Sequence, residues 1–277
     1  MTKSNQKNLQ VGHLKVPTDG NFSLSSIDPD DTCGLTDKKT ARKAHKKLSR
    51  ELDELQEVLF AQSKYAVLIV LQAMDTGGKD STIRRVFGPL NPQGVRVTSF
   101  KRPTDEELSR GYLWRIQKEI PWKGMVRIFN RSHYEDVLVV RVHEIVPLEE
   151  VELRYAQIND FERYLAENRV VVIKFMLHIS KEEQKRRLID RLERKDKHWK
   201  FNSGDLKERA IWHKYMEAFE IALNRCNTED APWYVIPANK KWARDVIISQ
   251  IVRDHLKKLP LKYPNPENGL EDIVIED

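Results

Sequence analysis

The chain has 277 residues and a mass of 32.5 kDa, which is enough for one large α/β domain or two small ones. Its net charge of +6 suggests a polyanionic partner, although solubility alone also explains an excess of this size. The two cysteines, Cys33 and Cys226, form no CxxC pair, so no zinc site or disulfide framework is indicated and we expect a cytoplasmic protein. No apolar run is long enough to cross a bilayer and the amino terminus lacks a signal-like apolar stretch, so we expect no membrane partner.

The pattern of apolar residues predicts an α/β fold. Residues 1–38 lack periodicity and are expected to form an irregular arm, whereas leucines recur every three or four residues from Lys39 to Gln62 and predict an amphipathic helix. Alternating strands and helices then predict a mostly parallel sheet with helices on both faces, within one domain over residues 39–260 and before a tail over 261–277. We expect strands at 65–71, 95–100, 125–129, 170–177 and 233–236, and helices around 105–119, 151–167, 205–225 and 240–258.

A glycine-bearing loop follows the first predicted strand and is a variant of the Walker A pattern GxxxxGK[ST]. Ala73 stands in place of the first glycine, and Asp80 stands in place of the serine or threonine. The start of the following helix favours an anion, glycines let the backbone approach phosphate oxygens, and a lysine adds positive charge. A glycine turn with a solvated lysine is the structural alternative. The residues predicted to bind phosphate here are Gly77, Gly78, Lys79, Asp80 and Ser81.

Acidic residues near two predicted strand ends suggest a magnesium site. Asp75 lies inside the phosphate loop, where a carboxylate repels phosphate unless a cation lies between them. The third strand ends near Asn130, where P-loop enzymes place a magnesium-binding aspartate, and either Glu135 or Asp136 supplies the missing charge. Arg131 is placed to clamp a phosphate through two hydrogen bonds. An Asx-turn or helix cap at Asp75, and a polar loop with one surface ion pair after the third strand, are the structural alternatives.

Five long segments resemble the polyphosphate kinase 2 family, and together they cover most of residues 45 to 258. They are far more specific than a lone phosphate loop, and the missing first glycine and the aspartate in the loop fit the family's own version of the motif. The segments are LIVLQAMDTGGKDSTIRRVFGPLNPQGV, FKRPTDEELSRGYLWR, FNRSHYEDVLVVRVHE, KHWKFNSGDLKERAIWHKY, which is similar to the family's lid region, and PWYVIPANKKWAR.

The resemblance implies a P-loop kinase fold like that of thymidylate kinase, with a five-stranded parallel sheet and a helical lid. It implies reversible transfer of a phosphoryl group from inorganic polyphosphate to AMP and ADP, or to other nucleotides such as GMP and GDP, in a homo-oligomer. Mg²⁺ is the expected cofactor, with Mn²⁺ as a substitute. Carried over by motif, Asp75, Lys79, Arg131 and Glu135 are the catalytic residues, and Asp75, Glu135 and Asp136 are the candidate metal ligands. Glu135 is similar to class III members, which phosphorylate both nucleoside mono- and diphosphates.

Residues 181–200 form a strongly basic segment that we predict to belong to a lid over about 180–204. Nine Lys or Arg residues stand against five Asp or Glu residues, which gives +4 of the chain's +6. Arg187, Arg191 and Arg194 recur at helical spacing, so we predict that they share one face and bind polyphosphate. A solvated helix with ion pairs along its surface is the structural alternative.

The boundaries of this lid are predicted from capping residues. Ser180 and Glu183 form a capping-box pattern, which predicts that a helix begins there. Asp205 is expected to cap the next helix, which would leave 200–204 as a hinge.

Two other function classes compete with this prediction. An ATP-dependent nucleoside monophosphate kinase shares the fold class but normally carries an intact GxxxxGK[ST] loop, which this chain lacks. A basic nucleic-acid-binding module would show a helix-turn-helix, RRM or zinc pattern, and none is visible, so we expect no nucleic-acid partner. We expect His133 to pack or hydrogen-bond rather than carry phosphate, since nothing in the sequence orients it as a nucleophile.

Overall fold

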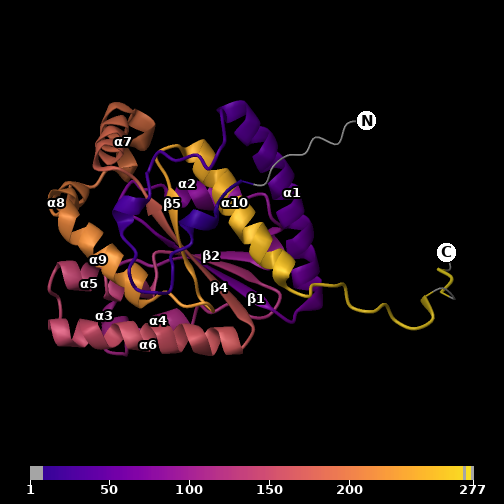
Figure 1. The fold of residues 1–277 in the computed structure, drawn as a ribbon. Helices are drawn as coiled ribbons and strands as arrows, with labels where there is room; N and C mark the ends of the chain where they lie inside the picture. Colours follow the sequence, from indigo (N-terminus) through magenta and orange to yellow (C-terminus); the bar gives the residue numbers. More distant parts are fainter. Residues whose placement is uncertain (1–8, 271–272, 276–277) are drawn as a thin grey trace.

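A five-stranded parallel sheet forms the centre of the computed structural model, which describes residues 9–270 and 273–275 (Figure 1). The strand order is β2-β3-β1-β4-β5, and every pairing between neighbours is parallel. The α/β fold and its five-stranded sheet are therefore confirmed. The strands are β1 (Ala66–Gln72), β2 (Val95–Ser99), β3 (Val126–Asn130), β4 (Val170–His178) and β5 (Trp233–Pro237).

Helices cover both faces of the sheet. The long helices α1 (Lys38–Gln62) and α10 (Lys241–Lys258) pack against each other on one side, and α6 (Leu148–Glu167) and α9 (Trp212–Arg225) lie on the other (Figure 1). Since both faces are covered, all seven residues of β1 are buried. The short helices are α2 (Lys79–Thr82), α3 (Asp105–Leu108), α4 (Trp114–Gln117), α5 (Val139–Val142), α7 (Lys181–Glu193) and α8 (Gly204–Ala210).

Two predicted helices are each divided in the structure. The helix expected around 105–119 forms α3 and α4, and Gly111, a poor helix former, lies between them. The helix expected around 205–225 forms α8 and α9, which are separated at Ile211, where ψ of 29° leaves the helical region. After α2 the chain continues with π-helical turns over Ile83–Phe87.

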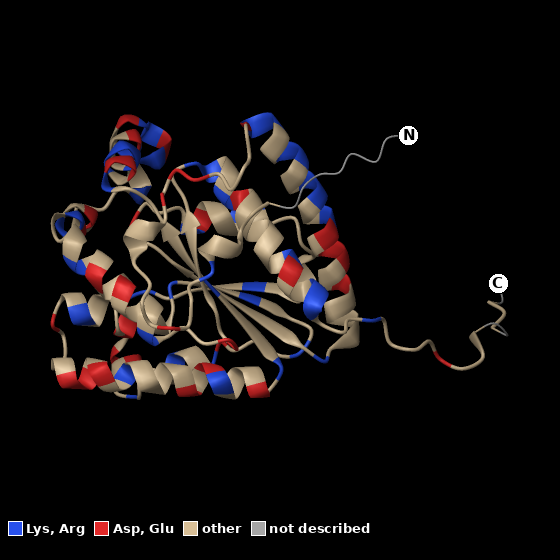
Figure 2. Cartoon of the chain, in the orientation of Figure 1, with Lys and Arg blue, Asp and Glu red and all other residues tan. Residues whose placement is uncertain are grey.

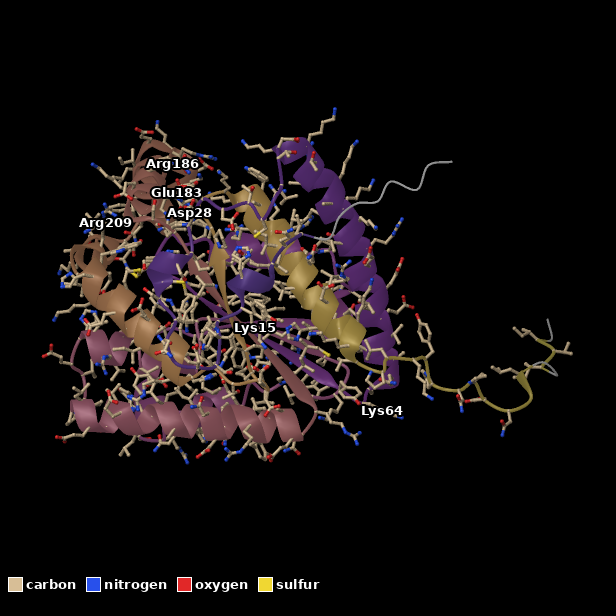
Figure 3. All side chains as sticks on the ribbon, viewed as in Figure 1. Lys15, Asp28, Lys64, Glu183, Arg186 and Arg209 are labelled. Carbon is tan, nitrogen blue, oxygen red and sulfur yellow. The ribbon has the colours of Figure 1, made fainter. Side chains whose placement is uncertain are left out.

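The strand order brings two predicted motifs together at one edge of the sheet. Because β3 lies directly beside β1, Leu71 and Asn130 are register partners, and the loops that follow the two strands are neighbours. Lys64, just before β1, and Glu183, shortly after β4, mark the amino and carboxyl ends of the sheet in Figure 3. In open α/β sheets, ligands bind at the carboxyl end near the point where the strand order reverses, and β1 is flanked there by β3 and β4.

The amino-terminal arm packs against the edge of the sheet at β5, whereas the described carboxyl-terminal tail extends away from it (Figure 1). The amino-terminal arm was predicted as irregular, and its described part contains two short 3-10 helices, Gly12–Leu14 and Leu24–Ser26, yet Leu14 and Val16 are fully buried in the core. Residues 1–8 of the arm and 271–272 and 276–277 of the predicted tail lie outside the described residues. Among the described helices, none combines the length and apolar character needed to span a bilayer.

Candidate active site

The loop between β1 and α2 is tightly turned. Thr76 and Gly78 have φ of 63° and 105°, and the amide of Gly77 donates to the carbonyl of Met74 at 3.0 Å. Lys79 folds back over the loop, and its Nζ donates to the carbonyl of Ala73 at 2.8 Å. Burial, together with the nearby Arg131 guanidinium, lowers the pKa of Lys79.

A cluster of one arginine and two carboxylates forms beside this loop. Arg131 directly follows β3, and its Nη2 lies 2.8 Å from Oδ1 of Asp75, while its Nη1 lies 3.6 Å from Oε2 of Glu135. Arg131 has φ of 63°, a left-handed conformation that costs about 1–2 kcal/mol for a residue with a Cβ. The structure thus brings together Asp75, Arg131 and Glu135, and Lys79 is close enough to contribute to their electrostatics.

Asp80 and Asn130 contact each other across the two loops. Nδ2 of Asn130 donates to Oδ1 of Asp80 at 2.9 Å, and Nζ of Lys200 lies 3.5 Å from the other carboxylate oxygen. A carboxylate has no proton to offer a phosphate at neutral pH, so the Asp80 side chain is placed to fix Asn130 and Lys200 instead. The hydroxyl of Ser81 is likewise engaged, because it donates to the carbonyl of Gly78 at 2.9 Å.

Asp136 does not join the carboxylate cluster. It points toward Arg154 of α6, whose Nη1 lies 3.4 Å from its Oδ1, and burial raises the pKa of Asp136 to about 6. It lines neither of the two cavities described below. We therefore correct the expectation that Asp136 holds a metal, and Glu135 is the remaining candidate after β3.

A buried polar network holds the chain that carries this cluster. Nζ of Lys174 in β4 lies 2.5 Å from Glu162 and donates to the hydroxyl of Tyr134 at 2.8 Å. Glu162 also accepts from the Tyr134 hydroxyl at 2.9 Å and lies 3.2 Å from Nε2 of His133. His133 is therefore fixed inside the core by Glu162, as a packed and hydrogen-bonded residue.

Two cavities open at the carboxyl edge of the sheet, and Asp75 and Arg131 line both. The larger has a volume of about 1650 Å³ and is bordered by fifteen Lys or Arg residues and four Asp residues. The smaller has a volume of about 240 Å³ and combines apolar and acidic side chains. Its lining includes Met74, Glu135, Leu138, Val139, Asp205, Glu208, Tyr215 and Phe219.

The predicted basic segment begins as a helix where expected. Oγ of Ser180 accepts from the amide of Glu183 at 3.1 Å, which caps the start of α7. The other half of the capping box is absent, because the Glu183 carboxylate binds Arg186 and Arg187 instead.

The three arginines predicted to bind polyphosphate have different surroundings. Arg187 and Arg191 both line the larger cavity. Arg187 is buried there and donates to backbone carbonyls and to Glu183, whereas Arg191 pairs with Asp205 at 3.0 Å. Arg194 is exposed, pairs with Asp196 at 2.8 Å and lines neither cavity. Their shared helical spacing therefore does not give them a shared role.

Asp205 does not cap the helix that follows the basic segment, so that prediction was wrong. The residue at the cap position is Ser203, and α8 already begins at Gly204. Asp205 is instead buried. Desolvation is the main cause that raises its pKa, the negative charge of the nearby Asp75 adds to this, and Arg191 opposes it.

Several basic residues of the larger cavity were not singled out from the sequence. Lys38, Arg42 and Lys46 follow one another at four-residue spacing on α1, a stripe that the sequence shows once it is sought. Figure 2 shows the first half of α1 mainly blue and its second half with red bands. The others are Arg84, Arg85, Lys101, Arg102, Lys241 and Arg244, whereas Lys197 and Lys200 belong to the predicted basic segment.

The fold and the site together define a P-loop phosphotransferase, with a lysine in the loop after β1 and an arginine–carboxylate cluster after the neighbouring strand. Residues 35–263 match the family described as Polyphosphate kinase 2 (PPK2), and the chain belongs to this family.

Relatives and a solved structure agree with this assignment. The AMP/ADP-polyphosphate phosphotransferase of Meiothermus ruber is 52% identical over 263 residues, which cover 95% of this chain and 98% of that protein. The ADP-polyphosphate phosphotransferase of Rhodopseudomonas palustris is 42% identical over 77% of this chain and 78% of its own length. The crystal structure of Polyphosphate Kinase 2 from Arthrobacter aurescens is similar with a TM-score of 0.91 at 46% identity, covering 94% of this chain and 93% of that chain.

Proposed function

We propose that this chain transfers a phosphoryl group reversibly between inorganic polyphosphate and AMP or ADP, with Mg²⁺. The observation that carries the proposal is that one basic and one partly apolar cavity share Asp75 and Arg131. Transfer between two substrates needs their reacting phosphates to meet at one point. The names of the two relatives, one acting on AMP/ADP and one on ADP, support the same substrates.

The larger cavity fits the polyphosphate donor. Its basic residues come from α1, α2 and the turns that follow it, the segment after β2, α7, the basic segment 195–200 and α10. Positive charge is therefore distributed around the cavity rather than placed at one point. Such a distribution of positive charge favours the binding of a linear polymer that carries a negative charge on every phosphate. We propose that Arg84, Arg102, Lys197 and Lys200 contact successive phosphates, and that residues 191–204 form the lid over them.

The smaller cavity fits the nucleotide acceptor. Tyr215, Phe219 and Leu138 supply aromatic and apolar surface for a base, while Asp75 and Arg131 lie where the nucleotide phosphates would end. In this arrangement Arg131 binds the acceptor phosphate, and Lys79 with the loop amides binds the phosphoryl group in transfer. Because the acceptor oxygen is already an anion, no general base is required.

The carboxylates of Asp75 and Glu135 fit a magnesium site. Both flank Arg131 at the smaller cavity, and carboxylate oxygens are the ligands Mg²⁺ prefers, usually one or two of them together with substrate phosphates. When bound there, the ion would neutralise charge on the phosphates that meet at this point. Asp75 and Glu135 hold Arg131 in place as well, so their loss is expected to affect both roles.

A single assay tests the proposal. Incubation with AMP, Mg²⁺ and polyphosphate, without ATP, should give ADP and then ATP, and Lys79→Ala should abolish this. Phosphorylation of AMP from ATP alone, with no use of polyphosphate, would favour an ATP-dependent monophosphate kinase. Salt-sensitive DNA binding without any transfer would favour a nucleic-acid-binding module.

Two properties of the whole protein follow as part of the proposal. We expect a homo-oligomer, because Leu148, Leu153 and Tyr164 are exposed on α6, and light scattering of the purified chain would test it. The cytoplasm is the proposed compartment, which is consistent with the free thiols of Cys33 and Cys226.

A further inference from the structure

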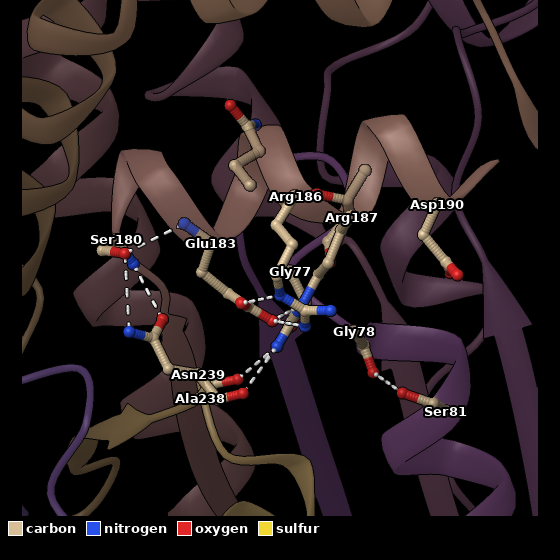
Figure 4. A network of polar contacts seen from close by, with 12 residues as sticks. Gly77, Gly78, Ser81, Ser180, Glu183, Arg186, Arg187, Asp190, Ala238 and Asn239 are labelled. Carbon is tan, nitrogen blue, oxygen red and sulfur yellow. Dashed lines mark hydrogen bonds and ion pairs between the residues drawn. The ribbon is translucent and has the colours of Figure 1, made fainter. Parts of the chain in front are cut away.

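Four successive carbonyl groups of the phosphate loop accept hydrogen bonds from side chains outside the loop. Nε2 of Gln184 in α7 donates to the carbonyl of Asp75 at 3.0 Å. Nη1 of Arg187, also in α7, donates to the carbonyls of Thr76 and Gly77 at 2.9 and 3.1 Å. Figure 4 shows Arg187 among its partners Glu183, Ala238 and Asn239. Arg244 of α10 completes the set and donates to the carbonyl of Gly78 at 3.3 Å.

Arg187 has a protein partner for each of its five N–H donors. Besides the two loop carbonyls, its Nη2 donates to the carbonyls of Ala238 and Asn239 at 2.6 and 3.2 Å, and its Nε donates to Glu183 at 2.6 Å. The side chain is only 5% exposed. A phosphate could reach it only by displacing a buried carbonyl or the Glu183 carboxylate, and either group would lose a charge-assisted hydrogen bond.

The contacts of Arg187 also set the direction of the loop amides. In a trans peptide the N–H points away from the carbonyl of the same unit, so fixing the carbonyl of Gly77 turns the amide of Gly78 in the opposite direction. The same holds for the amide of Lys79, whose peptide carbonyl is bound by Arg244. Within the described part of the chain, neither of these two amides donates to an acceptor, and both residues line the larger cavity.

We propose that Arg187 is a positioning residue for phosphoryl transfer: it fixes the carbonyl side of the phosphate loop so that the amides of Gly78 and Lys79 face the transferred group. This inference rests on the proposed function of the loop and replaces the expectation that Arg187 binds polyphosphate. It also divides the basic segment in two. The first half of α7 belongs to the support of the loop, and contacts with polyphosphate begin at Arg191.

The experiment compares Arg187 with its neighbour Arg186, which bears the same charge and also binds Glu183 but is 65% exposed and lies outside the larger cavity. Arg187→Met, Arg187→Lys and Arg186→Met are assayed with AMP and polyphosphate at two ionic strengths. Both Arg187 variants should lose about 10²-fold in kcat, because a loop displaced by roughly 1 Å loses that much. Their KM for polyphosphate and its salt dependence should stay within about twofold of wild type. Arg186→Met should retain all three values.

Two results would overturn the proposal. A raised polyphosphate KM with a flatter salt dependence and retained kcat in the Arg187 variants would make Arg187 a phosphate ligand. If both Arg187 variants retained the wild-type kcat and KM, Arg187 would have no role in the reaction. If Arg187→Met does not fold, Gln184→Met provides a second test, because it removes the hydrogen bond to the carbonyl of Asp75. Its kcat should fall while its KM for polyphosphate stays unchanged.

A separate readout does not depend on the proposed function. Amide hydrogen exchange of the peptide covering 73–82 should be faster in Arg187→Lys than in Arg186→Met, without any substrate. Absence of polyphosphate-dependent transfer in the wild-type chain would reject the proposed function but leave this exchange difference intact. Equal exchange in the two variants would reject the support of the loop by Arg187, whatever the wild-type activity.

Discussion

Replacing Gly78 with alanine tests how closely the phosphate loop is packed. Gly78 has φ of 105°, and a Cβ built on it would overlap Nη1 of Arg244. Arg244 cannot easily retreat, because it is fully buried and its other nitrogens bind Asp245 at 2.6 and 2.9 Å and Ser81 at 3.2 Å. Gly78→Ala must therefore either distort the loop or break the hydrogen bond from Arg244.

The expected cost comes from two sources. A residue with a Cβ in the left-handed region costs about 1–2 kcal/mol, and a buried donor left without its acceptor costs about 1–3 kcal/mol. Together they should lower the free energy of unfolding by about 2–5 kcal/mol, a large share of the roughly 5–15 kcal/mol typical of a folded domain. Because Lys79 follows directly, we expect the turnover of Gly78→Ala to fall as well.

Urea unfolding followed by tryptophan fluorescence measures this cost, with Gly111→Ala as the control. A Cβ at Gly111 meets nothing within 4 Å, and its φ is not positive, so the control should change stability by no more than about 0.5 kcal/mol. In an Arg244→Met background, Gly78→Ala should lower the free energy of unfolding only by the cost of the left-handed backbone, about 1–2 kcal/mol. Equal losses in Gly78→Ala and Gly111→Ala would refute the reasoning.

Three further predictions concern charge at and near the site. Lys79→Ala should keep the unfolding transition but lose on the order of 10²-fold or more in polyphosphate-dependent ADP formation; near-wild-type turnover at saturating polyphosphate would contradict it. Asp75→Asn and Glu135→Gln should each raise the Mg²⁺ concentration needed for half-maximal activity, and an unchanged midpoint in both would reject the metal assignment. Burial lowers the pKa of His178 to about 4, so the folded state keeps it neutral while the unfolded chain protonates near pH 6.5. The free energy of unfolding therefore decreases as pH falls from about 6.5 to 4, by up to about 1.4 kcal/mol per pH unit for this proton. Urea unfolding at several pH values should show a weaker pH dependence of this free energy in His178→Gln than in wild type. An equal dependence in the two proteins would contradict the assignment.

The strands could be predicted from the sequence almost to the residue, because burial on both faces demands continuous apolar runs. Predicted 170–177 and observed Val170–His178 differ by one position. The order of the strands could not be predicted in the same way, because a buried apolar segment does not indicate which other strand it pairs with. The contact between Asp75 and Arg131 follows from β3 lying beside β1, and only the structure supplies that adjacency.

The candidate site shows where local patterns stop being informative. Helical spacing placed Arg187 and Arg191 one turn apart correctly, with both at the larger cavity. Spacing does not reveal that Arg187 donates to loop carbonyls, whereas Arg191 pairs with Asp205. Asp205 matched a helix-cap pattern, a local interaction worth only about 1 kcal/mol. In the folded chain it is buried against Arg191 instead, a tertiary contact that sequence patterns do not show.

The meeting of two cavities at Asp75 and Arg131 has a consequence for stereochemistry. If the acceptor attacks the terminal phosphorus of the donor directly, the three remaining oxygens turn over as the new bond forms in line with the old one. A donor made chiral at that phosphorus by sulfur and oxygen isotopes would then give a nucleotide of opposite handedness. If the phosphoryl group were first transferred to a protein side chain and then to the nucleotide, the two displacements would together retain its original configuration.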